Sequence, residues 1–354
     1  MKTVRNESVE IKQIKEKPSR VFNRTIKVAM KAIIAGVLVA IGLSGCTSTK
    51  NDSGKMKVVT TIFAPYDFAR QITNDKADVT MLLAPGAETH SYEPSPQDII
   101  AISECDVFIY VGGENDTWLD GILETVENDH MEIIKLMDCV ETVPEEIPEG
   151  MEAEDDHDSE DSNHEEDVDN NAHNHSDEEE WDEHVWTSPI NAMIICRKMN
   201  EVFSKIDPEN ANEYQTNLDN YIAVLENLDN DFKEVVAEGK RKLLVFGDRF
   251  PLRYFVEEYN LDYYAAFPGC SSETEAGAST VAFLIDKVND ENIPVVFKIE
   301  LSNGNIAQTI SGGTDAEVMT FYSCHNVTKS DFDAGLTYVD LMKKNVDSLK
   351  IALN

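Results

Sequence analysis

Two short histidine motifs in the sequence have the residue types of a metal site. His90 lies in the segment HSYEPSP, and His184 opens the segment HVWTSP. Neutral imidazole and carboxylate groups are ligands that suit Zn²⁺, Mn²⁺ and related ions. The neighbouring Trp and Pro residues should fix both loops and orient each imidazole. The motifs therefore predict a metal site with His90 and His184 as ligands.

The elements that must position these histidines follow from the hydrophobic pattern. Short apolar, β-branched runs alternate with segments of helical periodicity, which is typical of right-handed βαβ units and parallel sheets. A helix predicted over 211–239 separates two groups of four strands, and it is long beside the roughly 11–12 residues of an average helix. We therefore expect an α/β fold with two lobes, each with a roughly four-stranded parallel sheet flanked by helices, joined by one long rigid helix. The strands are predicted in 56–63, 77–85, 106–113, 131–140, 241–248, 261–267, 294–300 and 316–323.

Three further polar residues fall at the carboxyl ends of predicted strands, where ligands bind in open parallel sheets. These are Asp248, Glu300 and His325. Zinc usually takes four ligands in a closed site. We expect His325 to supply an additional imidazole and Asp248 or Glu300 to supply a carboxylate.

Alternatives to this ligand set remain open. Cys324 could replace His325 as a ligand. Asp248 could instead pair with Arg249 or Arg253, and His325 could cap the last segment of the chain through Asn326 and Thr328.

Several segments together resemble the lipoproteins that bind metal for zinc and manganese ABC importers. They are APGAETHSYEPSPQDI (84–99), HVWTSP (184–189), the long helix and TYVDLMKKN (337–345), and the resemblance covers roughly 57–140 and 184–354. It implies two lobes with the metal between them, and an ABC permease with its ATPase as partners. His90 and His184 match the first two family ligands. The third ligand position falls on Gly247 and the fourth near Cys324 and His325, so the chain departs from the family pattern there.

An acidic segment interrupts the predicted fold. From residue 145 to residue 183 there are 20 acidic residues and no Lys or Arg, more than half of the formal net charge of −37. Such a surface repels nucleic acid and attracts cations. We expect 141–183 to be a disordered insertion. Its histidines are expected to gather metal loosely, although a solvated spacer is the alternative, and they are His157, His164, His173 and His175. Zinc members of the resembled family often carry such a loop, which favours Zn²⁺ over Mn²⁺.

The N-terminal residues have the pattern of a bacterial lipoprotein signal. The apolar run AIIAGVLVAIGLSGC ends in Leu43-Ser44-Gly45-Cys46. The resemblance implies that residues 1–45 are removed and that Cys46 carries a lipid, with Met30 as an alternative start. An uncleaved anchor is the alternative, although the run is short for the ~20 residues of a membrane span. Residues 46–55 should form a tether, and the protein should lie outside the cytoplasm, anchored to a bacterial cell membrane.

Five further cysteines are present, namely Cys105, Cys139, Cys196, Cys270 and Cys324. Cys270 and Cys324 each follow a strand predicted to run to the same cleft. A disulfide between them is expected if those strands are neighbours, because the bridge needs Cα atoms within about 7 Å. Two inert thiols are the alternative.

The sequence thus predicts a binding protein and not an enzyme. The expected domains are an N-terminal lobe over 56–140 that ends with 184–210, the linking helix over 211–239 and a C-terminal lobe over 240–354. We expect a monomer that captures Zn²⁺ between its lobes and delivers it to an ABC permease. Manganese binding or surface adhesion with the same fold are the alternatives, and a zinc hydrolase is disfavoured because no HExxH, GxSxG or phosphate-binding glycine loop occurs.

Overall fold

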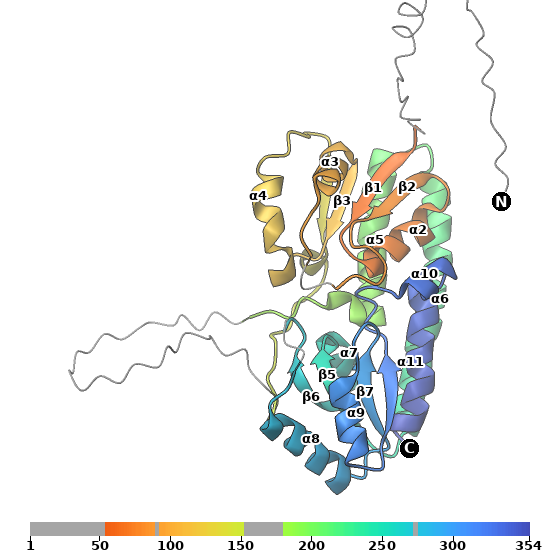
Figure 1. Ribbon diagram of the computed structural model, residues 1–354. Helices are drawn as coiled ribbons and strands as arrows, with labels where there is room; N and C mark the ends of the chain where they lie inside the picture. The colour runs from red at the N-terminus through yellow and green to blue at the C-terminus, as the bar shows by residue number, and fades with distance from the viewer. Residues whose placement is uncertain (1–53, 89–91, 152–179, 272–274) are drawn as a thin grey trace, which may run out of the picture. The chain divides into compact units, whose positions relative to one another are not determined.

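One parallel four-stranded sheet precedes helix α6 (Ala211–Glu238) in the chain and a second follows it, and α6 runs along both lobes (Figure 1). The computed structural model describes residues 54–88, 92–151, 180–271 and 275–354. The first sheet has the order β2-β1-β3-β4, and its strands are β1 (Met56–Thr60), β2 (Ala77–Met81), β3 (Val107–Tyr110) and β4 (Glu132–Lys135). The second has the order β6-β5-β7-β8, and its strands are β5 (Leu243–Phe250), β6 (Asp262–Pro268), β7 (Val295–Ile299) and β8 (Glu317–Phe321). The predicted fold class is confirmed.

Helices connect and cover the strands. In the described part of the chain they are α2 (Phe63–Thr73), α3 (Pro96–Glu104), α4 (Asp120–Leu123), α5 (Pro189–Ile206), α6 (Ala211–Glu238), α7 (Arg253–Tyr259), α8 (Ala278–Asp290), α9 (Asn305–Gly312), α10 (Lys329–Asp333) and α11 (Tyr338–Ala352). Three 3₁₀ helices are η1 (Glu114–Leu119), η2 (Leu136–Cys139) and η3 (Val185–Thr187). None of the helices among the described residues combines the length and the apolar character that a membrane crossing requires.

Helix α6 links the two lobes through one continuous hydrophobic core. It has 28 residues, and its buried side chains follow the predicted spacing of three and four. Val58 of the first sheet, Leu225 of α6 and Phe297 of the second sheet belong to the same cluster of buried residues. α6 packs against α2 and α5 of the first lobe and against α11, which lies alongside it in Figure 1. The two lobes therefore share a rigid apolar spine.

The Ser-Pro pairs of the two histidine motifs are helix starts. Ser95 caps α3 in a capping box with Asp98, and Ser188 caps α5 by accepting a hydrogen bond from the Asn191 amide. Proline follows the cap in both helices, where it has no amide hydrogen to lose. These caps fix where each helix begins, and hence where the loop that precedes it must end.

The structure differs locally from the sequence pattern. Residues 118–129 have the apolar spacing of a helix, but they form only the single turn α4 preceded by η1, and Gly121 in this turn disfavours a longer helix. Several strands are shorter than predicted, and the predicted strand 131–140 divides into β4 and η2. α10 was not predicted, because its five residues are too few to show helical periodicity.

Candidate metal centre

The chain enters the candidate site through a short antiparallel stem. The Glu145 amide donates to the Glu180 carbonyl at 2.8 Å, and the Asp182 amide donates to the Val143 carbonyl at 3.0 Å. Pro144 and Trp181 form the bridge between these bonds. The two described ends of the predicted insertion 141–183 are therefore paired with each other.

The middle of the insertion, residues 152–179, lies outside the described residues, and so do His157, His164, His173 and His175. His90 and Cys46 also lie outside them.

His184 follows the stem and is fully buried, with an exposed fraction of 0%. Its Nδ1 lies 3.2 Å from Asp182 Oδ1, which also accepts a hydrogen bond from the His184 amide at 2.8 Å. A carboxylate on Nδ1 places the proton there and leaves Nε2 with the lone pair in the neutral ring. His184 Nε2 is buried and has no hydrogen-bond partner among the described residues. The ring is thus oriented to use Nε2 as a ligand atom.

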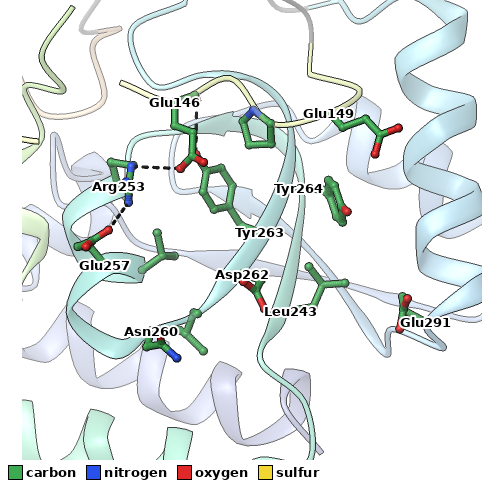
Figure 2. A pocket seen from close by; sticks show the side chains of 13 residues that line it. Glu146, Glu149, Leu243, Arg253, Glu257, Asn260, Asp262, Tyr263, Tyr264 and Glu291 are labelled. Atoms are coloured by element: carbon green, nitrogen blue, oxygen red, sulfur yellow. Dashed lines mark hydrogen bonds and ion pairs between the residues drawn. The ribbon is translucent and has the colours of Figure 1, made fainter. Parts of the chain in front are cut away.

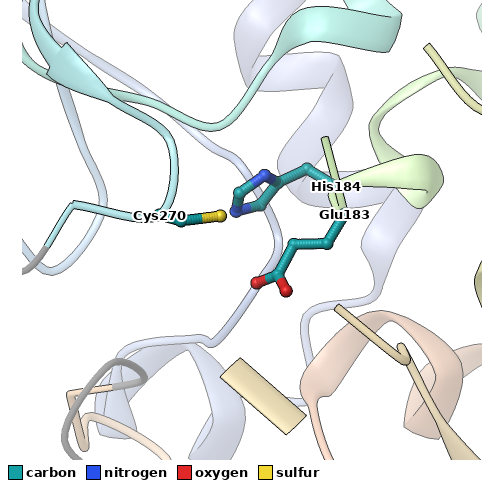
Figure 3. A group of neighbouring side chains, drawn as sticks. All are labelled: Glu183, His184 and Cys270. Atoms are coloured by element: carbon teal, nitrogen blue, oxygen red, sulfur yellow. The ribbon is translucent and has the colours of Figure 1, made fainter. Parts of the chain in front are cut away.

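Two other donor groups lie beside this imidazole. Three ligand atoms lie within 4.8 Å of one another, one from each of Glu183, His184 and Cys270. Figure 3 shows the Cys270 sulfur next to a ring nitrogen of His184, with the Glu183 carboxylate close to both. Glu183 is 2% exposed and accepts hydrogen bonds from the backbone and side-chain amides of Asn115. Imidazole, thiolate and carboxylate together are a donor set that zinc accepts.

Acidic neighbours raise the pKa values of His184 and Cys270. Burial alone would lower the pKa of His184, but the charge and hydrogen bond of Asp182, with Glu183 and Glu145 nearby, raise it above its ordinary value. Burial raises the pKa of Cys270 strongly, and the same carboxylates add to the effect. A metal ion must displace these protons, so metal binding here is coupled to proton release.

His325 lies beside the group but is not a member of it. Its ring centroid is 5.5 Å from that of His184 and 5.0 Å from that of Trp186, in edge-on arrangements. The backbone of His325 is fixed, because its amide donates to Ser323 Oγ and its carbonyl accepts from the Phe63 amide. The structure thus brings two of the histidines proposed as ligands together.

The carboxylates of Asp248 and Glu300 are engaged elsewhere. Asp248 lies inside β5, at its register shift, and accepts from the amides of Arg249 and Ile299. Glu300 accepts from the amide and the hydroxyl of Ser323 at 2.9 Å each. Burial raises the pKa of both carboxyl groups. In the structure both side chains join neighbouring strands and do not contribute to the group around His184.

Gly247, the residue on which the resemblance places the third family ligand, has no room for a side chain. A Cβ placed on Gly247 would lie 2.5 Å from Ala307 Cα and 2.6 Å from the Ala307 amide nitrogen. Helix α9 therefore packs directly on the backbone of β5, and no side chain fits at position 247 without moving it.

The predicted disulfide between Cys270 and Cys324 is absent, since both thiols are free. The physical reason is the strand order. β6 and β8, which the two cysteines follow, lie at opposite edges of the second sheet with β5 and β7 between them. Strands spaced ~4.8 Å apart place residues three strands away well beyond the ~7 Å that a bridge allows. Cys324 is instead a fully buried member of the core.

Glu183 and Cys270 were not predicted as donor groups. Glu183 is the direct neighbour of His184, which is a signal that sequence reasoning could have used. Cys270 was placed correctly at the carboxyl end of β6, but the strand order that turns it toward His184 is not visible in the sequence.

A separate cavity has none of Glu183, His184 and Cys270 in its lining. Its volume is about 770 Å³, and its lining includes Leu243 and Asp262, the first residues of β5 and β6 (Figure 2). Ligands of parallel sheets bind at the carboxyl ends of strands, whereas this cavity lies at the amino ends. Across its mouth Arg253 forms ion pairs with Glu146 and Glu257, which leaves a charged surface hollow.

Comparison with known proteins shows which family this chain and its fold resemble. Residues 58–352 match the sequence profile of the family described as the periplasmic component A of the zinc-uptake complex. The chain is 29% identical over 326 residues to the high-affinity zinc uptake system protein ZnuA of Bacillus subtilis, covering 91% of this chain and 96% of that protein. It is 28% identical over 319 residues to the zinc-binding lipoprotein AdcA of Streptococcus pneumoniae, covering 90% of this chain but only 60% of AdcA. The Zn(II)-bound ZnuA-like domain of AdcA superposes with a TM-score of 0.67 at 26% identity, covering 85% of this chain and 99% of that domain.

Proposed function

Because the chain belongs to the family of the periplasmic component A of zinc-uptake complexes, we propose that it captures Zn²⁺ outside the cytoplasm and delivers it to an ABC permease. One observation supports this proposal most directly. The buried Nε2 of His184 has no hydrogen-bond partner among the described residues, and the ring is oriented by Asp182 beside the Glu183 carboxylate and the Cys270 thiol. An unpaired polar atom in such a place is costly unless something binds it.

Zinc fits this donor set better than manganese does. Thiolate is a soft ligand that favours Zn²⁺, whereas Mn²⁺ prefers carboxylate, carbonyl and water oxygens. The related proteins from B. subtilis and S. pneumoniae are also named for zinc. We therefore retain Zn²⁺ as the transported ion and expect Mn²⁺ to bind more weakly.

His90 and His325 complete the proposal as further ligand candidates. His90 belongs to the loop between β2 and α3, and Glu88 and Tyr92 on either side of it line small cavities that His325 also lines. The histidines of the acidic segment would collect Zn²⁺ loosely for the site. A lipid on Cys46 would hold the protein, as a monomer without catalytic activity, at the cell membrane near the permease and its ATPase.

Metal binding by the purified protein tests the proposal. Competition against a zinc chelator should reveal one tight equivalent in the chain from residue 47 onward, and His184→Ala should weaken it by more than ~100-fold, since a ligand and its oriented lone pair are both lost. The matched control is His130→Ala, which alters an exposed histidine. Failure of the unaltered protein to bind zinc tightly would refute the proposed function.

A further inference from the structure

We propose that Cys270 is a thiolate ligand of the transported zinc ion, together with His184 Nε2 and the Glu183 carboxylate. This inference rests on the proposed function and adds to it the identity of the donor set. From the sequence, Cys324 was the cysteine considered as an alternative ligand, whereas Cys270 was assigned to a disulfide that does not form.

The positions of the donor atoms are the first argument. With Zn–N and Zn–O distances of ~2.0–2.2 Å and Zn–S near ~2.3 Å, a tetrahedral ion holds its donor atoms roughly 3.3–3.8 Å apart. The three ligand atoms already lie within 4.8 Å of one another. Shifts of about 1 Å in the side chains would bring these atoms to zinc distances. Because His184 and Glu183 follow the stem and Cys270 follows β6, the ion would join two separate segments of the chain.

The unpaired nitrogen of His184 is the second, independent argument. The imidazole is 0% exposed, its Nδ1 is committed to Asp182, and its Nε2 has no partner among the described residues. Figure 3 shows the Cys270 sulfur beside this ring. A thiol is only a weak hydrogen-bond donor, so it does not replace the interaction that the buried nitrogen lacks. A metal ion between nitrogen and sulfur would satisfy both atoms.

The backbone around Cys270 is held in place for this role. The Gly269 amide donates to Glu145 Oε1 at 3.2 Å, and Arg249 Nη1 donates to the Ser271 carbonyl at 3.1 Å. Gly269 also packs on the imidazole so closely that a Cβ there would lie 2.9 Å from His184 Cε1. The residues on both sides of Cys270 are therefore fixed against the His184 ring.

Charge balance is consistent with the same set. Zn²⁺ carries two positive charges, and one thiolate with one carboxylate neutralises them in a buried site where an uncompensated charge would be costly. Binding forms a Zn–S bond as the thiol proton leaves to solvent, so no oxidant or reductant is required. The closed position at Gly247 means that β5 offers no side chain to take the place of Cys270 there.

Cobalt and zinc binding by variants in which one cysteine is replaced by serine tests the inference. Co²⁺ added to the unaltered protein should give a near-ultraviolet thiolate-to-metal charge-transfer band besides its visible bands. Cys270→Ser should lose the charge-transfer band, keep the visible bands and bind zinc at least ~10-fold more weakly. The matched control is Cys139→Ser, which should retain both the charge-transfer band and the zinc affinity. It alters a half-buried thiol of the first lobe that contacts the Lys135 carbonyl.

The outcomes separate the inference from the proposed function. If the unaltered protein binds zinc tightly and His184→Ala abolishes binding, while Cys270→Ser leaves the cobalt spectrum and the zinc affinity unchanged, the thiolate assignment is wrong and the function stands. If the unaltered protein binds neither ion tightly, both are refuted. Persistence of the charge-transfer band in Cys270→Ser, with its loss in Cys324→Ser, would assign the thiolate to the other cysteine and overturn the inference.

Discussion

Individual side chains at the centre divide into those that offer donor atoms and those that orient them. Asp182 belongs to the second kind. It is 2% exposed, and a single oxygen accepts from both the amide and the ring of His184. It therefore fixes the tautomer and the direction of the imidazole.

Removal of this carboxylate should weaken zinc binding without removing a ligand. We expect Asp182→Ala to reduce the affinity by ~10–100-fold, as for other residues that orient metal-binding histidines. Asp182→Asn should cost less, because the amide oxygen can still accept from Nδ1. The measurement is competition with a chelator, and Asp120→Ala, which alters an exposed carboxylate of the first lobe, serves as the control. Equal affinities for Asp182→Ala and the control would contradict the orienting role.

A second buried carboxylate affects stability and not metal binding. Burial raises the pKa of Asp67 to about 6, against the hydrogen bonds from the Tyr338 amide and Gln71 that lower it. Between the ordinary aspartate pKa of ~3.9 and the raised value, the folded state holds more proton than the unfolded state. This residue's contribution to the free energy of unfolding is therefore largest below that window and falls as the pH rises through it.

Asp67→Asn should stabilise the protein at neutral pH only. The amide oxygen still accepts from Tyr338, and the buried charge is gone, so we expect a gain of about 2 kcal/mol at pH 7.5 and little change at pH 4.5. Urea unfolding of both proteins at the two pH values measures it. A gain of the same size at both would show that ionisation of Asp67 is not responsible.

At the scale of elements, α6 has the largest influence because it packs in the core of both lobes. Leu225 on its buried face is 0% exposed, whereas the adjacent Val224 is 40% exposed. We expect Leu225→Ala to lower the free energy of unfolding by ~2–5 kcal/mol and Val224→Ala to change it by less than ~0.5 kcal/mol.

Unfolding in denaturant, followed by fluorescence and by circular dichroism, measures this difference. Because the buried cluster is continuous through both lobes, the two signals should shift together in Leu225→Ala. Separate transitions for the two probes would mean that the lobes unfold independently and that α6 does not couple them.

The regular elements could be predicted from the sequence where periodicity was long, as for α6, whose observed range Ala211–Glu238 ends one residue before the predicted one. The donor group could be predicted only in part. The sequence places Asp248, Glu300 and Cys270 near strand ends, but it does not tell which carboxylates accept backbone amides. The sequence also does not reveal the strand order, which places Cys270 beside His184 and far from Cys324.

At the scale of the whole molecule, the two described ends of the acidic segment are paired in a stem. The bonds between residues 143–145 and 180–182 close the chain before and after residues 152–179. The packed residues next to the stem, including Met151 against the core, belong to the folded part.

Replacing residues 152–179 by a short Gly-Ser linker should therefore leave the tight zinc site intact. A change of loop length costs only about 0.6 kcal/mol per doubling, so the free energy of unfolding should change little. Calorimetry should show that only weaker zinc equivalents disappear. A variant with His157, His164, His173 and His175 replaced by Ala in the full-length segment distinguishes the histidines from the carboxylates. Loss of the tight equivalent, with the weak ones retained, would reverse the assigned roles.

The contact of α9 with Gly247 also bears on how such a site can evolve. A histidine at this position would require the backbone at Ala307 to retreat, because a Cβ alone would lie 2.5 Å from its Cα. Overpacking of this kind typically costs ~1–3 kcal/mol before any new ligand can bind. A single substitution of Gly247 would therefore not supply a histidine ligand unless α9 also moved away from β5.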